Sequence, residues 1–145
     1  PTDNRSAYNK AETYLMSIKP LRRPSLLDYY QSAKNATLAM WRNYQDMKID
    51  RTIHGDKYFH CKANCEAARH QPAGPAVAAT ISIGREVSQQ LEPRPVLSSH
   101  YKNDFQADQI ANHFGRNQGA NPNKQSQECK KLCPPYRVDG INSRY

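Results

Sequence analysis

The sequence has few large apolar residues and no long hydrophobic run. Hydrophobic residues make up 37% of the 145 positions, and the aromatic residues are three Phe, one Trp and nine Tyr. Because no stretch of about 18 apolar residues occurs, we expect no membrane-spanning segment. The chain is also too short for two comfortable cores. We therefore expect one domain with a modest core.

The sequence also lacks the motifs of common catalytic sites. It contains no HExxH motif, no Gly-rich phosphate loop and no Cys-His catalytic signature. We expect no cofactor, and whether the protein is an enzyme stays open. His60, with Asp56 one helical turn before it, is a weak candidate for a general acid-base group. We favour the alternative, a structural His60 that hydrogen-bonds the tail or a neighbouring helix.

Acidic residues are fewer than basic ones. The 13 Asp and Glu stand against 21 Lys and Arg, which gives a net charge of +8. A charge of this sign favours anionic partners such as phospholipid surfaces, nucleic acid, polyanionic glycans or an acidic protein. The plainer alternative is a charged surface that keeps the protein soluble. We expect an anionic surface or a lipid as the partner.

Helix-forming periodicity dominates the first half of the chain. Residues 6–18 predict a short helix, which Pro20 and Pro24 separate from the second one. This second helix begins at Ser25, because SLLD forms a capping box with Asp28, and it lasts to about residue 49. Apolar residues at three- and four-residue steps predict its inward stripe: Leu27, Tyr30, Ala33, Leu38, Trp41, Tyr44 and Met47.

Three further helices are expected. One has Asp56 as its N-cap and ends near residue 69, and another begins near Pro75. The inner side of the helix after Pro75 is marked by Val77, Ile81, Val87 and Leu91. Residues 91–100 form a loop, and the last long helix covers about residues 103–114, with Gly115 at its C′ position. The tail is coil with a short helical turn near residues 128–132, and no strand alternation appears. The fold class is all-α.

Four cysteines form two pairs with the same spacing. Cys61 and Cys65 lie on one face of a predicted helix, and Cys129 and Cys133 repeat the interval in the tail. Facing antiparallel segments allow two bridges, Cys61 to Cys133 and Cys65 to Cys129. The sequence alone leaves three connectivities, a zinc site and free thiols as alternatives. We favour bridges over a metal site, and therefore an extracytosolic location, secreted or periplasmic.

Residues 40–86 resemble the serum amyloid A family without a gap. The residues that carry this resemblance are Met40-Trp41-Arg42, Tyr44, Asp46-Met47, Asp56-Lys57-Tyr58-Phe59-His60, Asn64, Ala67, Ala68, Gly74, Ile81-Ser82 and Arg85-Glu86. Later matches are Ala107-Asp108-Gln109, Ala111-Asn112, Gly115-Arg116 and Asn121-Pro122-Asn123. The match covers roughly residues 36–145, and a DKYFH-type motif with both flanks in register is specific.

The departures from the family pattern are informative as well. The pattern has no cysteine at positions 61 and 65, and the form FHCKANCEAA resembles serum amyloid A-like domains at the C-termini of bacterial Rhs-type polymorphic toxins. Residues 1–24 have no recognisable counterpart. We therefore divide the chain into an N-terminal extension and connector, residues 1–24, and a helical domain with its tail, residues 25–145.

The resemblance implies a small four-helix bundle whose extended C-terminal tail packs along the helices. It also implies binding of lipid or apolar ligands, with no catalytic role established for the motif. We take Trp41 as a core residue and Asp108 with Arg116 as an end-of-helix ion pair. The remaining motif residues are expected to be structural: Tyr44, Asp56, Lys57, Tyr58, Phe59, His60, Asn64, Arg85 and Asn112.

These resemblances suggest two functions. The first is the C-terminal effector module of a bacterial polymorphic toxin, which acts on the envelope or another anionic target of a neighbouring cell and has an immunity protein as partner. The alternative is a secreted, non-enzymatic protein that binds lipid, apolar ligands or anionic surfaces. The cysteine-bearing motif leads us to expect the effector.

Overall fold

The computed structural model describes residues 22–91 and 98–145, and their regular structure is entirely helical. The helices are α2 (Leu26–Asp50), α3 (Asp56–Ala68), α4 (Gly74–Leu91), α5 (Ser98–Ala120) and α6 (Cys129–Leu132), with 3-10 turns at Pro122–Lys124 and Pro134–Tyr136. The all-α prediction is confirmed for these residues. The helix predicted over residues 6–18 lies outside the described part. Within that part, no helix is both long and apolar enough to cross a bilayer.

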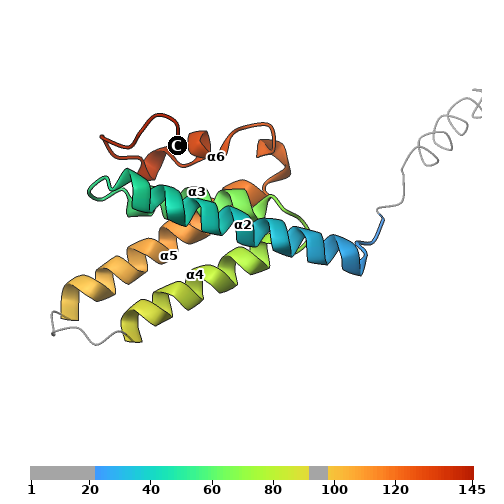
Figure 1. Ribbon diagram of the computed structural model, residues 1–145, viewed down its shortest axis with the longest axis horizontal. Coiled ribbons are helices and arrows are strands. Elements are labelled where there is room, and N and C mark those ends of the chain that lie inside the picture. The colour runs from blue at the N-terminus through green and yellow to red at the C-terminus, as the bar shows by residue number, and fades with distance from the viewer. Residues whose placement is uncertain (1–21, 92–97) are drawn as a thin grey trace, which may run out of the picture.

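Helix α3 lies at the centre of the bundle. It contacts α2, α4, α5 and α6, and nearly all of its residues are buried. In Figure 1, α2 crosses above the neighbouring α4 and α5, while the C-terminal tail covers the other side of α3. This arrangement gives α3 two distinct environments, one beneath the tail and one facing α4 and α5.

The beginning of α2 agrees with the capping prediction. The Ser25 Oγ accepts a hydrogen bond from the Asp28 backbone N–H at 3.1 Å, and the Asp28 carboxylate accepts one from the Ser25 N–H at 2.7 Å. The predicted cap of α3 is wrong by one residue, because Gly55 is the N-cap and Asp56 is the first helical residue.

The predicted inner stripe of α2 is wrong. Its buried residues are Ser32, Ala36, Ala39 and Asn43, whereas Trp41 is 58% exposed and Tyr30 is 67% exposed. Ala36 and Ala39 pack with Ala67 of α3 and Ala78 of α4. Small side chains let helix backbones approach closely, so alanine is favoured where α2 crosses α3 and α4. The large apolar residues of α2 lie beside this crossing.

The inner side of α4 differs from the prediction for the same reason. The buried residues of α4 are four positions apart along the helix: Gly74, Ala78, Ser82 and Glu86. A Cβ at Gly74 would overlap the carbonyl oxygen of Ala67. The predicted inner residue Leu91 is instead 78% exposed.

Helix α5 is longer at both ends than predicted. It begins at Ser98, inside the expected loop, and passes through Gly115 to Ala120. Gly115 is thus no C′ residue. A Cβ at Gly115 or Gly119 would overlap the carbonyl oxygen of Cys61 or Cys65, respectively. Glycine is required at these two positions because α5 touches the backbone of α3 there.

Two disulfides join α3 to the tail. Cys61 is bonded to Cys133 and Cys65 to Cys129, with Cα–Cα separations of 6.0 and 5.8 Å. This is the favoured connectivity, and it uses all four cysteines of the chain. The bridges lie in an apolar cluster with other buried side chains, namely Tyr58, Phe59, Leu132, Ile141 and Tyr145.

Arg137 fastens the end of the chain to α3. Its guanidinium donates to the Tyr58 hydroxyl at 2.8 Å and to the Tyr145 carbonyl at 3.0 Å. It also donates to the carbonyls of Ile141 and Asn142 at 3.2 and 3.1 Å. One cation therefore satisfies several acceptors that the irregular tail leaves without helical partners.

Candidate functional site

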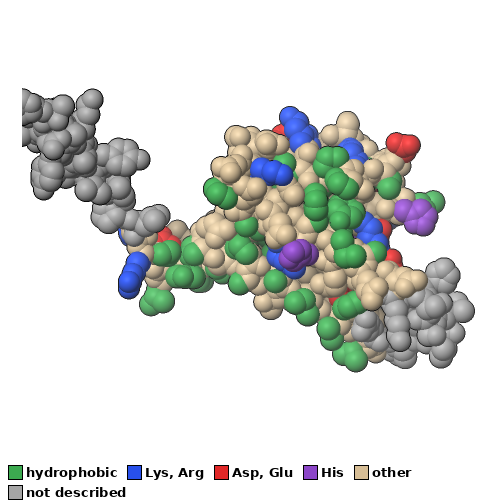
Figure 2. Space-filling view, turned by 180° about the vertical axis from the view of Figure 1, so that it is seen from behind, with side chains coloured by type: hydrophobic (Ala, Val, Ile, Leu, Met, Phe, Trp, Pro, Cys, Tyr) green, Lys and Arg blue, Asp and Glu red, His purple; other side chains and the backbone are tan. Residues whose placement is uncertain are grey.

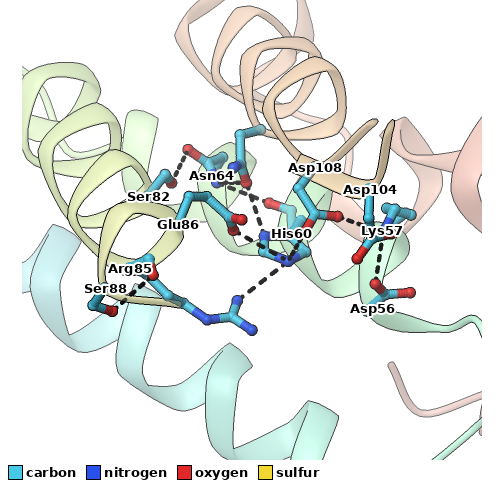
Figure 3. A network of polar contacts seen from close by, with 11 residues as sticks. Asp56, Lys57, His60, Asn64, Ser82, Arg85, Glu86, Ser88, Asp104 and Asp108 are labelled. Atoms are coloured by element: carbon cyan, nitrogen blue, oxygen red, sulfur yellow. Dashed lines mark hydrogen bonds and ion pairs between the residues drawn. The ribbon is translucent and has the colours of Figure 1, made fainter. Parts of the chain in front are cut away.

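The side of α3 that faces α4 and α5 carries a network of polar residues (Figure 3). Its members come from three helices: Asp56, Lys57, His60 and Asn64 of α3, Ser82, Arg85 and Glu86 of α4, and Asp104, Asp108, Asn112 and Arg116 of α5. Positions 57, 60 and 64 share one helical face. Eight of the motif residues that the sequence singles out are therefore brought together here, whereas Trp41, Tyr44, Tyr58 and Phe59 lie outside the network.

Lys57 is the cationic centre of one end of the network. Its Nζ lies 2.7 Å from Asp56, 2.6 Å from Asp104 and 2.5 Å from Asp108. Burial by itself would lower the pKa of Lys57, but the hydrogen bonds that its ammonium donates to these carboxylates raise the pKa well above the usual range. Lys57 therefore stays charged and offsets the buried carboxylate of Asp108.

His60 lies at the middle of the network and is buried. Its Nδ1 is 3.1 Å from Asn112 Oδ1, which also accepts from the Asn64 side chain at 2.8 Å. Its Nε2 is 3.2 Å from the Arg85 guanidinium. Burial, and next the charge of Arg85, lower the pKa of His60. We assign a neutral imidazole whose Nδ1–H donates to Asn112 and whose Nε2 accepts from Arg85.

Glu86 and Asp108 form the acidic part of the network. Burial, with the negative charge of Asp108 beside it, raises the pKa of Glu86 to about 7. The Glu86 Oε1 is 3.8 Å from His60 Nε2, and the Asp108 Oδ2 is 3.6 Å from the same atom. Glu86 therefore changes charge near neutral pH, inside the contact between α4 and α5.

The geometry gives no support to an acid-base pair of Asp56 and His60. The Asp56 carboxylate is paired with Lys57, and both His60 nitrogens have other partners. Asp56, His60 and Asp108 do offer ligand atoms within 4.8 Å of one another. The Lys57 ammonium already contacts both carboxylates, however, so the place of a cation is filled by the protein itself.

The predicted ion pair between Asp108 and Arg116 is wrong. Asp108 pairs with Lys57, and Arg116 donates to the Asn64 side-chain oxygen at 2.9 Å. The two residues are two helical turns apart on α5, so each faces a different residue of α3. The sequence singled out both residues but not their partners.

A groove opens between α2, α3 and α4, with a volume of about 370 Å³. Its apolar wall consists of Met40, Trp41, Tyr44, Met47, Phe59, Ala63 and Ile81. Its polar lining consists of Thr37, Asn43, His60, Asn64, Ser82, Arg85, Ser88 and Gln89. Sequence reasoning missed this groove. The apolar stripe of α2 could have indicated the groove, because several of its large residues, which the sequence assigns to the core, line the groove instead.

Comparison with known proteins agrees with this fold and motif. The family model described as serum amyloid A protein matches residues 27–145. The chain belongs to the serum amyloid A family. It is 44% identical over 108 residues to the serum amyloid A protein of Felis catus, and these residues cover 73% of this chain and 74% of that relative. It is 38% identical over 119 residues to serum amyloid A-3 of Mus musculus, at 82% and 83% coverage.

These relatives bear on the two functions expected from the sequence. The serum amyloid A resemblance is confirmed, whereas the relatives lend no support to the bacterial toxin resemblance or to an immunity protein as partner. They favour the alternative, a binding protein of the serum amyloid A type. The effector interpretation stays a prediction with no specific contact in the structure behind it.

Proposed function

We propose that the protein is an extracytosolic binding protein of the serum amyloid A type that takes an apolar chain into the α2–α3–α4 groove. The observation that carries this proposal is the apolar wall of the groove, formed by Met40, Trp41, Phe59 and Ile81 among others. Its volume of about 370 Å³ falls in the range of small-molecule sites. Burial of an alkyl chain against this wall would supply the binding free energy.

The start of α2 supports contact with a lipid surface. Leu26 is 90% exposed there, and Leu27 and Tyr30 are exposed beside it. Arg22 and Arg23 precede them and are exposed as well. In Figure 2, apolar and basic side chains cover the first turns of α2, next to the grey segment. Exposed apolar side chains beside cations suit the interface of an anionic membrane.

The disulfides and the named relatives both support an extracytosolic location. Two buried bridges persist in oxidising compartments and are rare in the cytosol. The relatives are named serum proteins. We infer secretion from these two facts, and nothing specific favours a periplasm.

A matched pair of isoleucines on α4 tests the groove. Ile81 lines it, whereas Ile83 is exposed and does not. Trp41 is the single tryptophan and lies in the groove wall, so its fluorescence reports binding. Titration with tetradecan-1-ol should shift the Trp41 emission to the blue and saturate at one ligand per chain.

We expect Ile81→Gln to weaken this binding about fivefold to tenfold, because a polar amide replaces part of the apolar wall. Ile83→Gln should bind like the unaltered protein. No saturable shift in the unaltered protein, or the same loss in both variants, would contradict the proposed function.

A further inference from the structure

The polar lining of the groove includes one cation, Arg85. Arg85 extends from α4 toward α3, and its guanidinium lies 3.2 Å from His60 Nε2 (Figure 3). The guanidinium carbon lies 5.2 Å from the centre of the Tyr44 ring on α2. Among the residues that the structure describes, no carboxylate forms an ion pair with Arg85. Its hydrogen-bonding partner is a neutral imidazole, which orients the guanidinium without cancelling its charge.

Neither neighbouring carboxylate forms an ion pair with Arg85. Glu86 is next to Arg85 in sequence and lies within the range of its charge, but it is buried near Asp108 and His60 and makes no direct contact with the guanidinium. Asp108 is paired with Lys57. Neither acid lines the groove, whereas Arg85 does. The groove therefore combines an apolar wall with one half-buried positive charge in its polar lining.

We propose that the groove selects a long-chain carboxylate, with the carboxylate on Arg85 and the alkyl chain along the apolar wall of α2, α3 and α4. This inference rests on the proposed function and names its ligand class. A planar guanidinium fork matches the two oxygens of a carboxylate. Ser88 and Gln89 also line the groove; the Ser88 hydroxyl donates to the Arg85 carbonyl, and the Gln89 amide is a neutral hydrogen-bonding group.

The alternatives to a carboxylate fit this site less well. A long-chain alcohol can occupy the apolar wall but gains no charge-assisted hydrogen bond at Arg85. A quaternary ammonium would meet a cation of its own sign. The volume of about 370 Å³ suits one chain. The order of affinity should therefore be carboxylate, then alcohol, then ammonium.

The test uses three ligands with the same fourteen-carbon chain: tetradecanoate and tetradecyltrimethylammonium below their micelle concentrations, and tetradecan-1-ol below its solubility limit. Trp41 fluorescence of the intact disulfide-bonded chain measures each affinity. We expect tetradecanoate to bind about tenfold more tightly than the alcohol, as one charge-assisted contact provides. Tetradecyltrimethylammonium should bind more weakly than the alcohol.

Variants of Arg85 assign this preference to one side chain. Arg85→Gln should lower the affinity for tetradecanoate about tenfold and leave that for tetradecan-1-ol unchanged. Arg42→Gln is the matched control, because Arg42 is exposed on α2 and does not line the groove. It removes the same net charge and should preserve the preference for the carboxylate. Arg85→Lys keeps the positive charge but loses the planar pair of donors, so it should keep part of the preference for the carboxylate.

Two results would overturn the inference. Equal affinities for the carboxylate and the alcohol in the unaltered protein exclude headgroup selection, even if Arg85→Gln does not fold. Equal losses in Arg85→Gln and Arg42→Gln assign the preference to overall charge. If the alcohol binds and either of these two results is found, only the headgroup inference fails. If none of the three ligands gives a saturable shift, the proposed function itself fails.

Discussion

The two sides of α3 are built in opposite ways. Beneath the tail, the contact is apolar and covalent: two disulfides lie among Tyr58, Phe59 and Leu132. Facing α4 and α5, the contact is polar, with Lys57 and His60 at its centre. The tail side derives its strength from burial and loop closure. The network side depends on buried charges and hydrogen bonds between three helices, and the groove opens beside it.

Breaking the covalent side should have the largest effect on stability. Each disulfide closes a loop of 72 or 64 residues, which the chain-entropy model values at about 4 kcal/mol. Serine at all four cysteines should lower the free energy of unfolding by at least about 4 kcal/mol, as urea denaturation followed by circular dichroism would measure. Because the two bridges join the same segments, replacing either pair alone should cost less than replacing both. Unchanged stability without any bridge would contradict this account of the tail.

The contact between α3 and α5 can be broken without touching the disulfides. Gly115→Ala places a Cβ against the Cys61 carbonyl, and the helices must separate. We expect a loss of about 3 kcal/mol in the free energy of unfolding. Gly84→Ala is the control, since a Cβ on Gly84 meets nothing within 4 Å. That variant should gain up to about 1 kcal/mol, because alanine favours helix over glycine. A similar loss in both variants would show that the close approach is not the cause.

The network side should respond to pH where the tail side does not. The pKa of Glu86 is raised from 4.5 to about 7 in the folded protein, so the folded state holds a proton that the unfolded state releases. Stability from this group is therefore present at low pH and is lost as pH rises toward 7. Glu86→Gln cannot ionise at this position. The difference in the free energy of unfolding between this variant and the unaltered protein should therefore grow by about 2 kcal/mol, in favour of the variant, from pH 5 to pH 8. A difference between the two proteins that does not change with pH would contradict the shift.

The smallest expected effect concerns Trp41, which the sequence assigns to the core. Because Trp41 is 58% exposed, Trp41→Ala should cost about 1 kcal/mol or less. A buried tryptophan would cost roughly 3 to 5 kcal/mol. Thermal unfolding followed by circular dichroism separates the two cases. A large loss would mean that the groove is closed in solution.

The sequence singled out most of the site residues but not their contacts. The DKYFH segment drew attention to Lys57 and His60, and the later matches to the family drew attention to Asp108, Asn112 and Arg116. Which residues meet across the helices could not be predicted, because each partner depends on the rotation and height of α5 against α3. Asp108 therefore pairs with Lys57, and Arg116 reaches Asn64.

Local signals determined the helical class, the capping of α2 and the family, because each depends on neighbours in the chain, and the matched spacings favoured the cysteine pairing without fixing it. Only the tertiary structure decided which face of each helix is buried. Close backbone approach selects Gly, Ala and Ser at the crossings, so a stripe of large apolar residues does not mark the core. The same packing leaves Trp41 and its neighbours at the surface, where they form the wall of the groove.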